Sequence, residues 1–321
     1  MHALVAELRD GDELLVIDNA SSDGTPDAVR EAAPDATVIE AGENLGFAAA
    51  SNRGAALATR ELLLFLNPDA VVAPGFRDAI ELPLSDGRGW AAWQGLVTSN
   101  GGRTLNSRGG AIHFTGIAWA GGAGEPLKAE PAVASEPGFV SGACLAMPAV
   151  SFEEACGFPD PFFLYHEDVD LSLRLRLDGG HLGVEPRARV DHDYDFAKGP
   201  RKWRLLERNR WATVIRTYPA ALLALLAPAL IATELALVPI SLAGGWGRQK
   251  LASWLDLMRW LPRLLQERRD VQATRRTSAR SFAHALTPDL DSSYLGAPGR
   301  SRLLRGALRA YWSAVLALLP R

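Results

Sequence analysis

The chain has 321 residues, 48% of them hydrophobic, which is enough for a catalytic domain with a sizeable core and argues against a disordered protein. A net charge of −3 and a pI near 6.1 argue against a dedicated nucleic-acid binder, although acidic residues predominate early in the chain and basic residues late. The two cysteines, Cys144 and Cys156, lack metal-ligand spacing, fit a reducing compartment and are expected in the core. The N-terminus has no signal-peptide pattern, so we expect no export by that route.

Short apolar strands alternate with helices in the first part of the chain. Residues 14–17, 37–40 and 61–66 have the length and composition of buried strands. Helices are predicted between them, over 27–33 and 48–59. This alternation is typical of βαβ units. It predicts an α/β fold with a mostly parallel, doubly wound sheet.

The sequence changes character between residues 90 and 146, where glycine-rich stretches predict hairpins and loops. Asn100-Gly101 is typical of a tight turn. A helix is predicted to continue from the acidic residues 167–170 and to end near residue 177, before two glycines. We expect a catalytic domain over residues 1–218.

Residues 219–321 predict a helical, membrane-associated region. Residues 220–243 are almost entirely apolar and long enough to cross a bilayer, but Glu234 and two prolines interrupt them. Basic residues flank both ends, so charge selects no orientation. Residues 220–243 could therefore form a helix that spans the membrane, re-enters it or lies in its plane. They could also form a buried helix of a soluble domain. Residues 251–269 mix leucine and tryptophan with basic residues, as interfacial helices do, and 303–319 repeat this pattern.

Three carboxylates follow an aromatic segment. Glu167, Asp168 and Asp170 lie within one predicted helical turn, directly after residues 157–165, which are rich in phenylalanine and proline. Favourable charge placement in the first turn of a helix is the alternative, but it explains one or two acids better than three. A carboxylate in a partly apolar pocket can act as a general base.

A second carboxylate follows the strand 61–66, in Asn67-Pro68-Asp69. Ligands bind at the carboxyl ends of strands in open α/β sheets. The sequence has neither the glycine fingerprint of a dinucleotide site nor a P-loop, so we expect phosphates to be held through a divalent cation on Asp69. The alternative interpretation of Asn67-Pro68-Asp69 is an ordinary turn at the end of a strand. His192 is a candidate second ligand or diphosphate contact, although a lone histidine is more often structural.

Polar residues also follow the first predicted strand. Asp18, Asn19 and Ser21 could bind a nucleotide base or ribose, although ordinary turns are rich in the same residue types. Taken alone, these residues are weak evidence for a nucleotide site.

In chain order, these motifs resemble the inverting, GT-A fold glycosyltransferases of family 2, and within them the bacterial rhamnosyltransferase-like branch. The resemblance covers about residues 14–218. The matching segments are 16–24, 44–52, 67–70, 139–143, 157–171 and 208–210.

The resemblance implies a role for individual residues. Asp168 would be the base that deprotonates the acceptor hydroxyl, with Glu167 beside it, and His192 would bind the metal together with Asp69. The residues on the acceptor side would be Gly142, Ala143 and Asp170. The nucleotide-sugar-binding residues would be Asp18, Asn19, Ser21, Asn44, Gly46, Asn52, Asn67 and Asp69.

The implied activity is transfer from a nucleotide-diphosphate sugar, with dTDP-rhamnose favoured, to a lipid-linked or cell-envelope glycan. It would need Mg²⁺ or Mn²⁺ and take place at the cytoplasmic face of the cell membrane. N-acetylglucosamine or galactofuranose could replace rhamnose as the transferred sugar. A non-catalytic, membrane-anchored partner of an active transferase is the alternative from another class.

Two features depart from the family pattern. Asn67 replaces the first acid of the usual D-x-D motif, so Asp69 would bind the metal with less help. The hydrophobic strand with which members of the family open is not present ahead of residues 3–9. Because that strand would cover neighbours built for burial, we expect the natural start to lie upstream of Met1.

Overall fold

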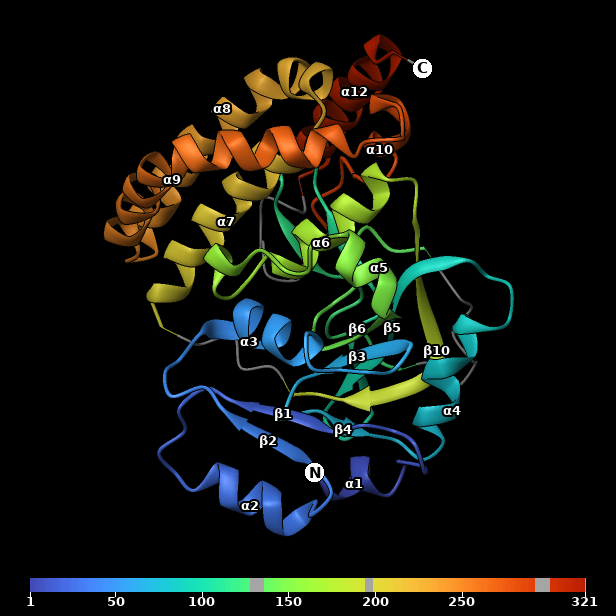
Figure 1. The fold of residues 1–321 in the computed structure, drawn as a ribbon. Coiled ribbons are helices and arrows are strands. Elements are labelled where there is room, and N and C mark those ends of the chain that lie inside the picture. The colour runs from blue at the N-terminus through green and yellow to red at the C-terminus, as the bar shows by residue number, and fades with distance from the viewer. Residues whose placement is uncertain (128–135, 194–198, 292–300, 321) are drawn as a thin grey trace.

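The computed structural model describes residues 1–127, 136–193, 199–291 and 301–320. Figure 1 shows a central sheet with a small α/β unit at one end of the molecule and a layer of long helices at the other. The N-terminus lies with the small unit and the C-terminus with the helical layer.

Strands and helices alternate in the N-terminal unit, as predicted. Its elements are α1 (His2–Val5), β1 (Leu15–Asp18), α2 (Thr25–Ala32), β2 (Thr37–Glu40) and α3 (Gly46–Ala55). β1 and β2 pair in parallel and form a two-stranded sheet of their own. The strand expected ahead of β1 stays a prediction.

The main sheet has six strands. Five follow one another across it in the order β3 (Leu62–Leu66), β9 (Cys144–Pro148), β5 (Trp90–Ser99), β10 (His181–Asp191) and β4 (Val71–Val72), while β6 (Thr104–Ser107) also pairs with β5. Among these described strands only β5 and β10 are parallel, and the other pairs are antiparallel.

The prediction of a mostly parallel, doubly wound sheet is therefore wrong for this sheet, although the α/β class is confirmed. Parallel neighbours need a long crossover, usually a helix, whereas antiparallel neighbours do not. The glycine-rich segment between β5 and β9 supplies no crossover helix in its described part. It contains the hairpin of β7 (Gly110–Ile112) and β8 (Ala118–Ala120).

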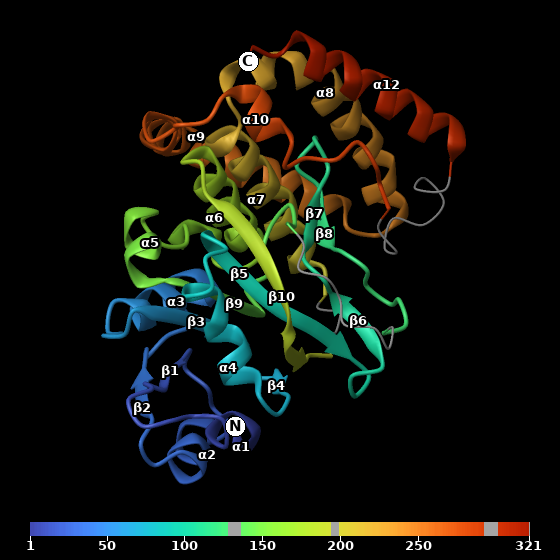
Figure 2. The same ribbon diagram turned by 90° about the vertical axis from the view of Figure 1, so that its right-hand side faces the viewer.

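The structure has short and long helical elements, and long helices form most of the layer at the far end of the molecule from α2 (Figures 1 and 2). The short elements are α4 (Phe76–Glu81), η1 (Leu82–Leu84), α5 (Ala149–Glu154), η2 (Asp160–Phe162) and α10 (Ala279–Ala283). The longer helices are α6 (Glu167–Leu177), α7 (Arg201–Thr217), α8 (Ala220–Ala243), α9 (Gly247–Ala273) and α12 (Arg302–Leu318). Among the described helices, α8 alone is long and apolar enough to cross a membrane by length and composition.

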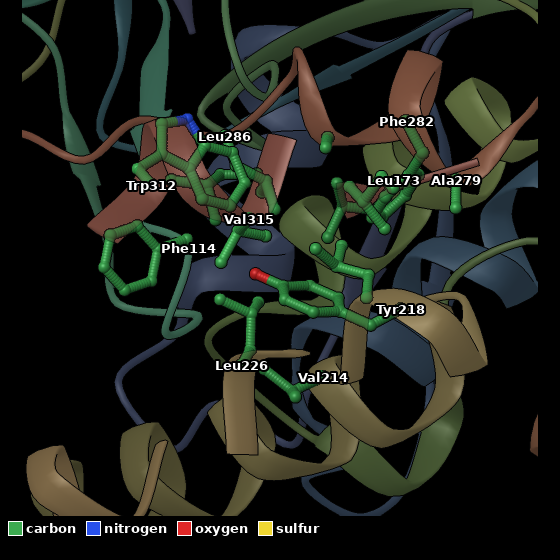
Figure 3. Packing of buried hydrophobic residues seen from close by; sticks show 14 of the residues in the cluster. Phe114, Leu173, Val214, Tyr218, Leu226, Ala279, Phe282, Leu286, Trp312 and Val315 are labelled. Atoms are coloured by element: carbon green, nitrogen blue, oxygen red, sulfur yellow. The ribbon is translucent and has the colours of Figure 1, made fainter. Parts of the chain in front are cut away.

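The largest core joins the two predicted domains. Figure 3 shows Leu173 of α6 and Val214 of α7 packed together with Leu226 of α8, Phe282 of α10 and Trp312 of α12. Burying each such side chain contributes about 1.5–3 kcal/mol. The helix that carries the acidic motif therefore shares its core with the C-terminal helices, on both sides of the predicted boundary at residue 218.

The other face of α6 packs toward the sheet. Leu171 and Leu175 belong to a second core with Leu63 of β3 and Leu145 of β9. Helix α6 is thus fixed between the sheet and the helical layer.

The two cysteines differ in environment. Cys144 is fully buried in β9, and burial raises the pKa of its thiol to about 12. Cys156 is exposed, so the prediction that both are core residues is wrong for Cys156. It lies in the turn after α5 with a φ of 58°, and this turn projects the side chain away from the core.

Candidate active site

The turn after β1 is fixed to the start of α3. The buried carboxylate of Asp18 accepts a hydrogen bond from the Ser21 amide at 3.1 Å. The Asn19 side chain accepts from the Leu45 amide at 3.2 Å and donates to the Gly46 carbonyl at 3.3 Å. These bonds bring the predicted donor-binding residues together at the carboxyl end of β1.

Gly46 touches the loop that leads into α6. Its φ is 78°, and a Cβ atom here would lie 2.4 Å from the Phe163 carbonyl oxygen. Asn44 accepts a hydrogen bond from the Gly46 amide at 3.0 Å, and the Ala48 amide donates to the same Phe163 oxygen at 3.3 Å. Only glycine fits this approach and this backbone conformation.

Asp69, in the turn after β3, and His192, directly after β10, lie close together. Asp69 Oδ1 lies 3.1 Å from His192 Nε2, and Asn67 Nδ2 lies 3.3 Å from the same nitrogen. His192 is 4% exposed, while the Asp69 side chain is 60% exposed and faces outward from the pair. The structure therefore brings together the two residues predicted to bind the metal, although they are 123 positions apart in the sequence.

This pair fits a cation whose shell is completed by substrate. Among the described residues, no group of three or more His, Cys, Asp or Glu side chains could hold a metal ion. Mg²⁺ and Mn²⁺ commonly take one or two protein ligands and complete their shell with phosphate oxygens and water. The exposed carboxylate of Asp69 is open to such a ligand set.

Asp168 stands at the start of α6 beside a backbone loop. Its carboxylate accepts hydrogen bonds from the Gly142 amide at 3.0 Å and from the Val169 amide at 2.8 Å. Burial raises the pKa of Asp168, and these two bonds oppose that rise. A partly desolvated carboxylate with a raised pKa suits a general base.

The loop at Gly142 links this base to the Asp69 side of the site. The Ala143 carbonyl accepts from the Asn67 amide at 3.1 Å, while the adjacent Gly142 amide donates to Asp168. Two residues of one loop thus contact both the strand end of the predicted metal pair and the predicted base.

Comparison with known proteins identifies relatives of this chain. The family model described as "Glycosyl transferase family 2" matches residues 1–116. An N-acetylglucosaminyl-diphospho-decaprenol L-rhamnosyltransferase, found in two strains of Mycobacterium tuberculosis, is 30% identical over 210 residues. The match covers 58% of this chain and 68% of the relative. The chain belongs to glycosyltransferase family 2.

A solved structure supports the fold of this glycosyltransferase. The crystal structure of GalNAc-T7 with UDP, GalNAc and Mn²⁺ superposes with a TM-score of 0.54 at 16% identity. The match covers 70% of this chain and 46% of that one, so this chain spans less than half of its length. The predicted family and the predicted enzyme class are confirmed.

Two predicted site residues of the glycosyltransferase have partners within the protein. Asp170 is fully buried and forms ion pairs with Arg174 at 2.6 Å and Arg216 at 3.0 Å. It neutralises two buried guanidinium groups and ties α6 to α7, while its predicted acceptor contact stays a prediction. Acids in a first helical turn face different sides of the helix, which the sequence motif alone does not separate.

Asn52 also has a structural place. Its amide accepts from the Phe158 amide at 2.9 Å and donates to the Phe158 carbonyl at 2.8 Å and to Asp160 at 2.6 Å. These bonds fasten α3 to the loop ahead of α6. The side chain is engaged within the protein, and the predicted nucleotide contact stays a prediction.

Gln94 belongs to the site although no sequence motif indicated it. It is fully buried in β5, and its side-chain oxygen accepts from the Ser141 amide at 2.8 Å, next to Gly142. A lone glutamine inside the apolar run of residues 90–97 was the available signal, because a buried amide needs partners.

Asn209 lies in the segment 208–210, which matched the family pattern without an assigned role. Its side-chain nitrogen donates to the carbonyls of Phe162 at 3.0 Å, Leu164 at 3.0 Å and Tyr165 at 2.7 Å. Phe163, Tyr165 and His166 all have positive φ angles, between 66° and 72°. Residues other than glycine rarely adopt positive φ angles, so this loop needs stabilising contacts from other parts of the protein. The hydrogen bonds from Asn209 are such contacts.

Glu167 lies next to Asp168, the predicted base. Its carboxyl is buried, and one oxygen has no hydrogen-bond partner within the described part of the chain. Burial, and then the neighbouring charge of Asp168, raise the pKa of Glu167 well above its usual range. This placement suits a group that keeps its proton while Asp168 ionises.

We expect Asn209→Ala to lower kcat about tenfold to a hundredfold, because lost hydrogen bonds of about 1 kcal/mol each would loosen the loop that carries Asp168. Steady-state kinetics with nucleotide binding by calorimetry would measure this. Thr213→Ala, which removes a buried hydroxyl one turn along α7, is the matched control. Wild-type kcat in a folded Asn209→Ala variant would contradict the positioning role.

Glu167→Gln should change the pH dependence of stability. Because the folded-state pKa is raised, the wild type loses stability as the pH rises from the unfolded pKa toward the folded pKa. The glutamine variant lacks this loss, so it should gain stability relative to wild type at neutral pH but not below about pH 4. Urea unfolding at both pH values checks this, with exposed Glu43→Gln as control. Equal differences at both values would contradict the raised pKa.

Proposed function

We propose that this glycosyltransferase moves a sugar from a nucleotide-diphosphate donor to a lipid-linked or cell-envelope glycan, with inversion at the anomeric carbon. The observation that carries the proposal is the loop of Gly142 and Ala143, which contacts both Asp168 and the strand end beside Asp69. It supports a donor diphosphate and an acceptor hydroxyl lying on either side of one reacting centre.

The donor would bind across the ends of β1 and β3. Asp18 and Asn19 would face the nucleoside, and its diphosphate would lie beside Asp69 and His192. The positions of Asp18 and Asn19 at the end of β1, and of Asp69 beside His192 after β3 and β10, support this orientation.

Asp168 would take the proton from the acceptor hydroxyl. The acceptor oxygen then forms a bond to the anomeric carbon as the bond from that carbon to the diphosphate oxygen breaks. Attack from the side opposite the leaving group inverts the configuration, and the electron pair leaves with the nucleotide diphosphate. The raised pKa of Asp168 supports its role as the proton acceptor.

Asp69 and His192 would hold a divalent cation, Mg²⁺ or Mn²⁺. When bound, it would neutralise the charge that develops on the departing diphosphate. The two converging side chains support this assignment, as does the Mn²⁺ named with the GT-A transferase of similar fold.

Rhamnose from dTDP-rhamnose is the favoured transferred sugar. The rhamnosyltransferase named among the relatives supports it, and the decaprenol in that name supports a lipid-linked acceptor. N-acetylglucosamine and galactofuranose are the alternative sugars, and a panel of donors would distinguish them.

Attachment to the cytoplasmic face of the cell membrane is part of the proposal. The apolar α8 and the basic, leucine-rich α9 support it. A non-catalytic partner of an active transferase is the alternative that the retained Asp69, Asp168 and His192 argue against.

Asp168→Asn should lower transfer at least about a thousandfold, because the amide cannot accept the acceptor proton. Donor binding should stay near the wild-type level. A radiolabelled transfer assay and calorimetry measure the two properties. Asp178→Asn, at the other end of α6, is the control. Loss of donor binding in a folded Asp168→Asn protein would contradict the assignment of the base.

Asp69→Asn and His192→Ala should each weaken dTDP or UDP binding about tenfold or more in the presence of Mn²⁺, which corresponds to about 1.4 kcal/mol. The difference should shrink when EDTA replaces the cation. Exposed Asp35→Asn should match the wild type. If the folded wild-type chain binds neither nucleotide, the non-catalytic alternative becomes the better explanation.

A further inference from the structure

The solvent-exposed face of α8 consists of apolar residues alone. Every exposed residue in this helix is alanine, leucine, isoleucine or proline. Positions 224, 228, 231, 235, 239 and 242 recur every three or four residues, so they form a stripe along one side of the helix. Leu235 and Leu242 are each 68% exposed. Such a long apolar stripe on a protein surface is typical of an interaction site.

The neighbouring helix α9 has a basic, amphipathic exposed face. Leu251, Leu255, Met258 and Leu265 are exposed on it. Four exposed arginines accompany these residues: Arg248, Arg259, Arg263 and Arg269. Apolar side chains flanked by arginines are typical of helices that lie in the interface of a bilayer with anionic lipids.

The two faces belong to one end of the molecule. α8 and α9 lie side by side in the helical layer, away from the N-terminal unit (Figures 1 and 2). An apolar groove of about 370 Å³ lies between them and α7, and its lining includes Trp211, Trp254 and Met258. We call the exposed faces of α8 and α9 together the apolar end surface.

Glu234, the one charged residue of α8, points toward the protein and is fully engaged there. One of its carboxylate oxygens binds Arg210 and accepts from Trp211 Nε1 at 2.8 Å. The other accepts from Trp254 Nε1 at 2.9 Å and pairs with Lys250 at 2.8 Å. The middle of the apolar helix is thus tied to α7 and α9.

These partners are rooted in the catalytic domain. Arg210 is 2% exposed and also donates to the Thr115 carbonyl at 3.0 Å. Arg210 and Lys250 both pair with Glu207 of α7. Asn209, which holds the loop before Asp168, precedes Arg210 directly in α7.

This buried charge cluster argues against α8 crossing the bilayer. The helix is about 36 Å long, so a spanning orientation would place Glu234 and its charged partners near the bilayer centre. Charges at that depth are costly, and α7 with part of the catalytic domain would have to enter the lipid with them. An orientation parallel to the surface buries the apolar stripe in lipid and keeps the cluster within protein.

We propose that the apolar end surface docks on an anionic lipid bilayer, with α8 lying in the plane of the interface. The proposal rests on the proposed function, in which the acceptor is membrane-linked. Because α7 connects the charge cluster to the loop that carries Asp168, docking would hold the predicted base at a fixed height above the membrane.

Vesicle flotation tests the docking surface. The wild type should float with phosphatidylcholine vesicles that contain phosphatidylglycerol, and less with phosphatidylcholine alone. The double variant Ile231→Glu and Leu235→Glu should lower the bound fraction at least tenfold and leave nucleotide binding unchanged. Leu57→Glu, at a residue 51% exposed in the turn after α3, should float like the wild type. Equal flotation of the double variant would overturn the proposal.

Cysteine labelling tests the in-plane orientation. In a Cys156→Ser background, a cysteine is placed at Ala221 or at Ala243, one at each end of α8. With protein added to sealed vesicles, a membrane-impermeant maleimide should react at both ends. Protection of one end alone would show a spanning helix and overturn the in-plane orientation.

Two further outcomes separate the explanations. A dimer in analytical ultracentrifugation that the double variant abolishes, without vesicle binding, would assign the surface to a second copy and overturn the proposal. Nucleotide binding without flotation would count against the docking surface alone. Flotation without nucleotide binding would count against the proposed function alone.

Discussion

The backbone of the loop from Phe162 to His166 is the constraint on which the rest of the site depends. Its strained conformation is supported on one side by the Asn209 amide and on the other by contact with Gly46. The donor-side turn, the base-bearing helix and the helical layer meet at this loop. A shift in any of them would move Asp168 relative to the strand ends.

The acidic side chains near this loop differ in their burial and in their partners. Asp168, the predicted base, is half-buried and receives two backbone hydrogen bonds. Asp170, two residues later, is fully buried between Arg174 and Arg216 and serves as a counter-ion. Neighbouring acids in one helical turn thus have opposite roles because they face different sides of α6.

Helix α7 connects the loop before Asp168 to the apolar end surface. Asn209 faces the base-bearing loop, while Arg210 faces Glu234 of α8. These two consecutive residues of α7 therefore connect the loop before Asp168 to helix α8. This connection explains why a carboxylate interrupts an otherwise apolar helix: it anchors the helix to the protein, and the exposed stripe stays wholly apolar.

The sequence by itself determined the local features. Runs with one strong preference, such as Thr37–Glu40 and Ala220–Ala243, have the predicted bounds, and the motif order indicated the family. Only the tertiary structure decided the strand directions, the hydrogen bonds of Asn52, the burial of Asp170 and the partners of Glu234. The reason is physical: periodicity and turn chemistry act over a few residues, whereas pairing and burial depend on segments far apart in the chain.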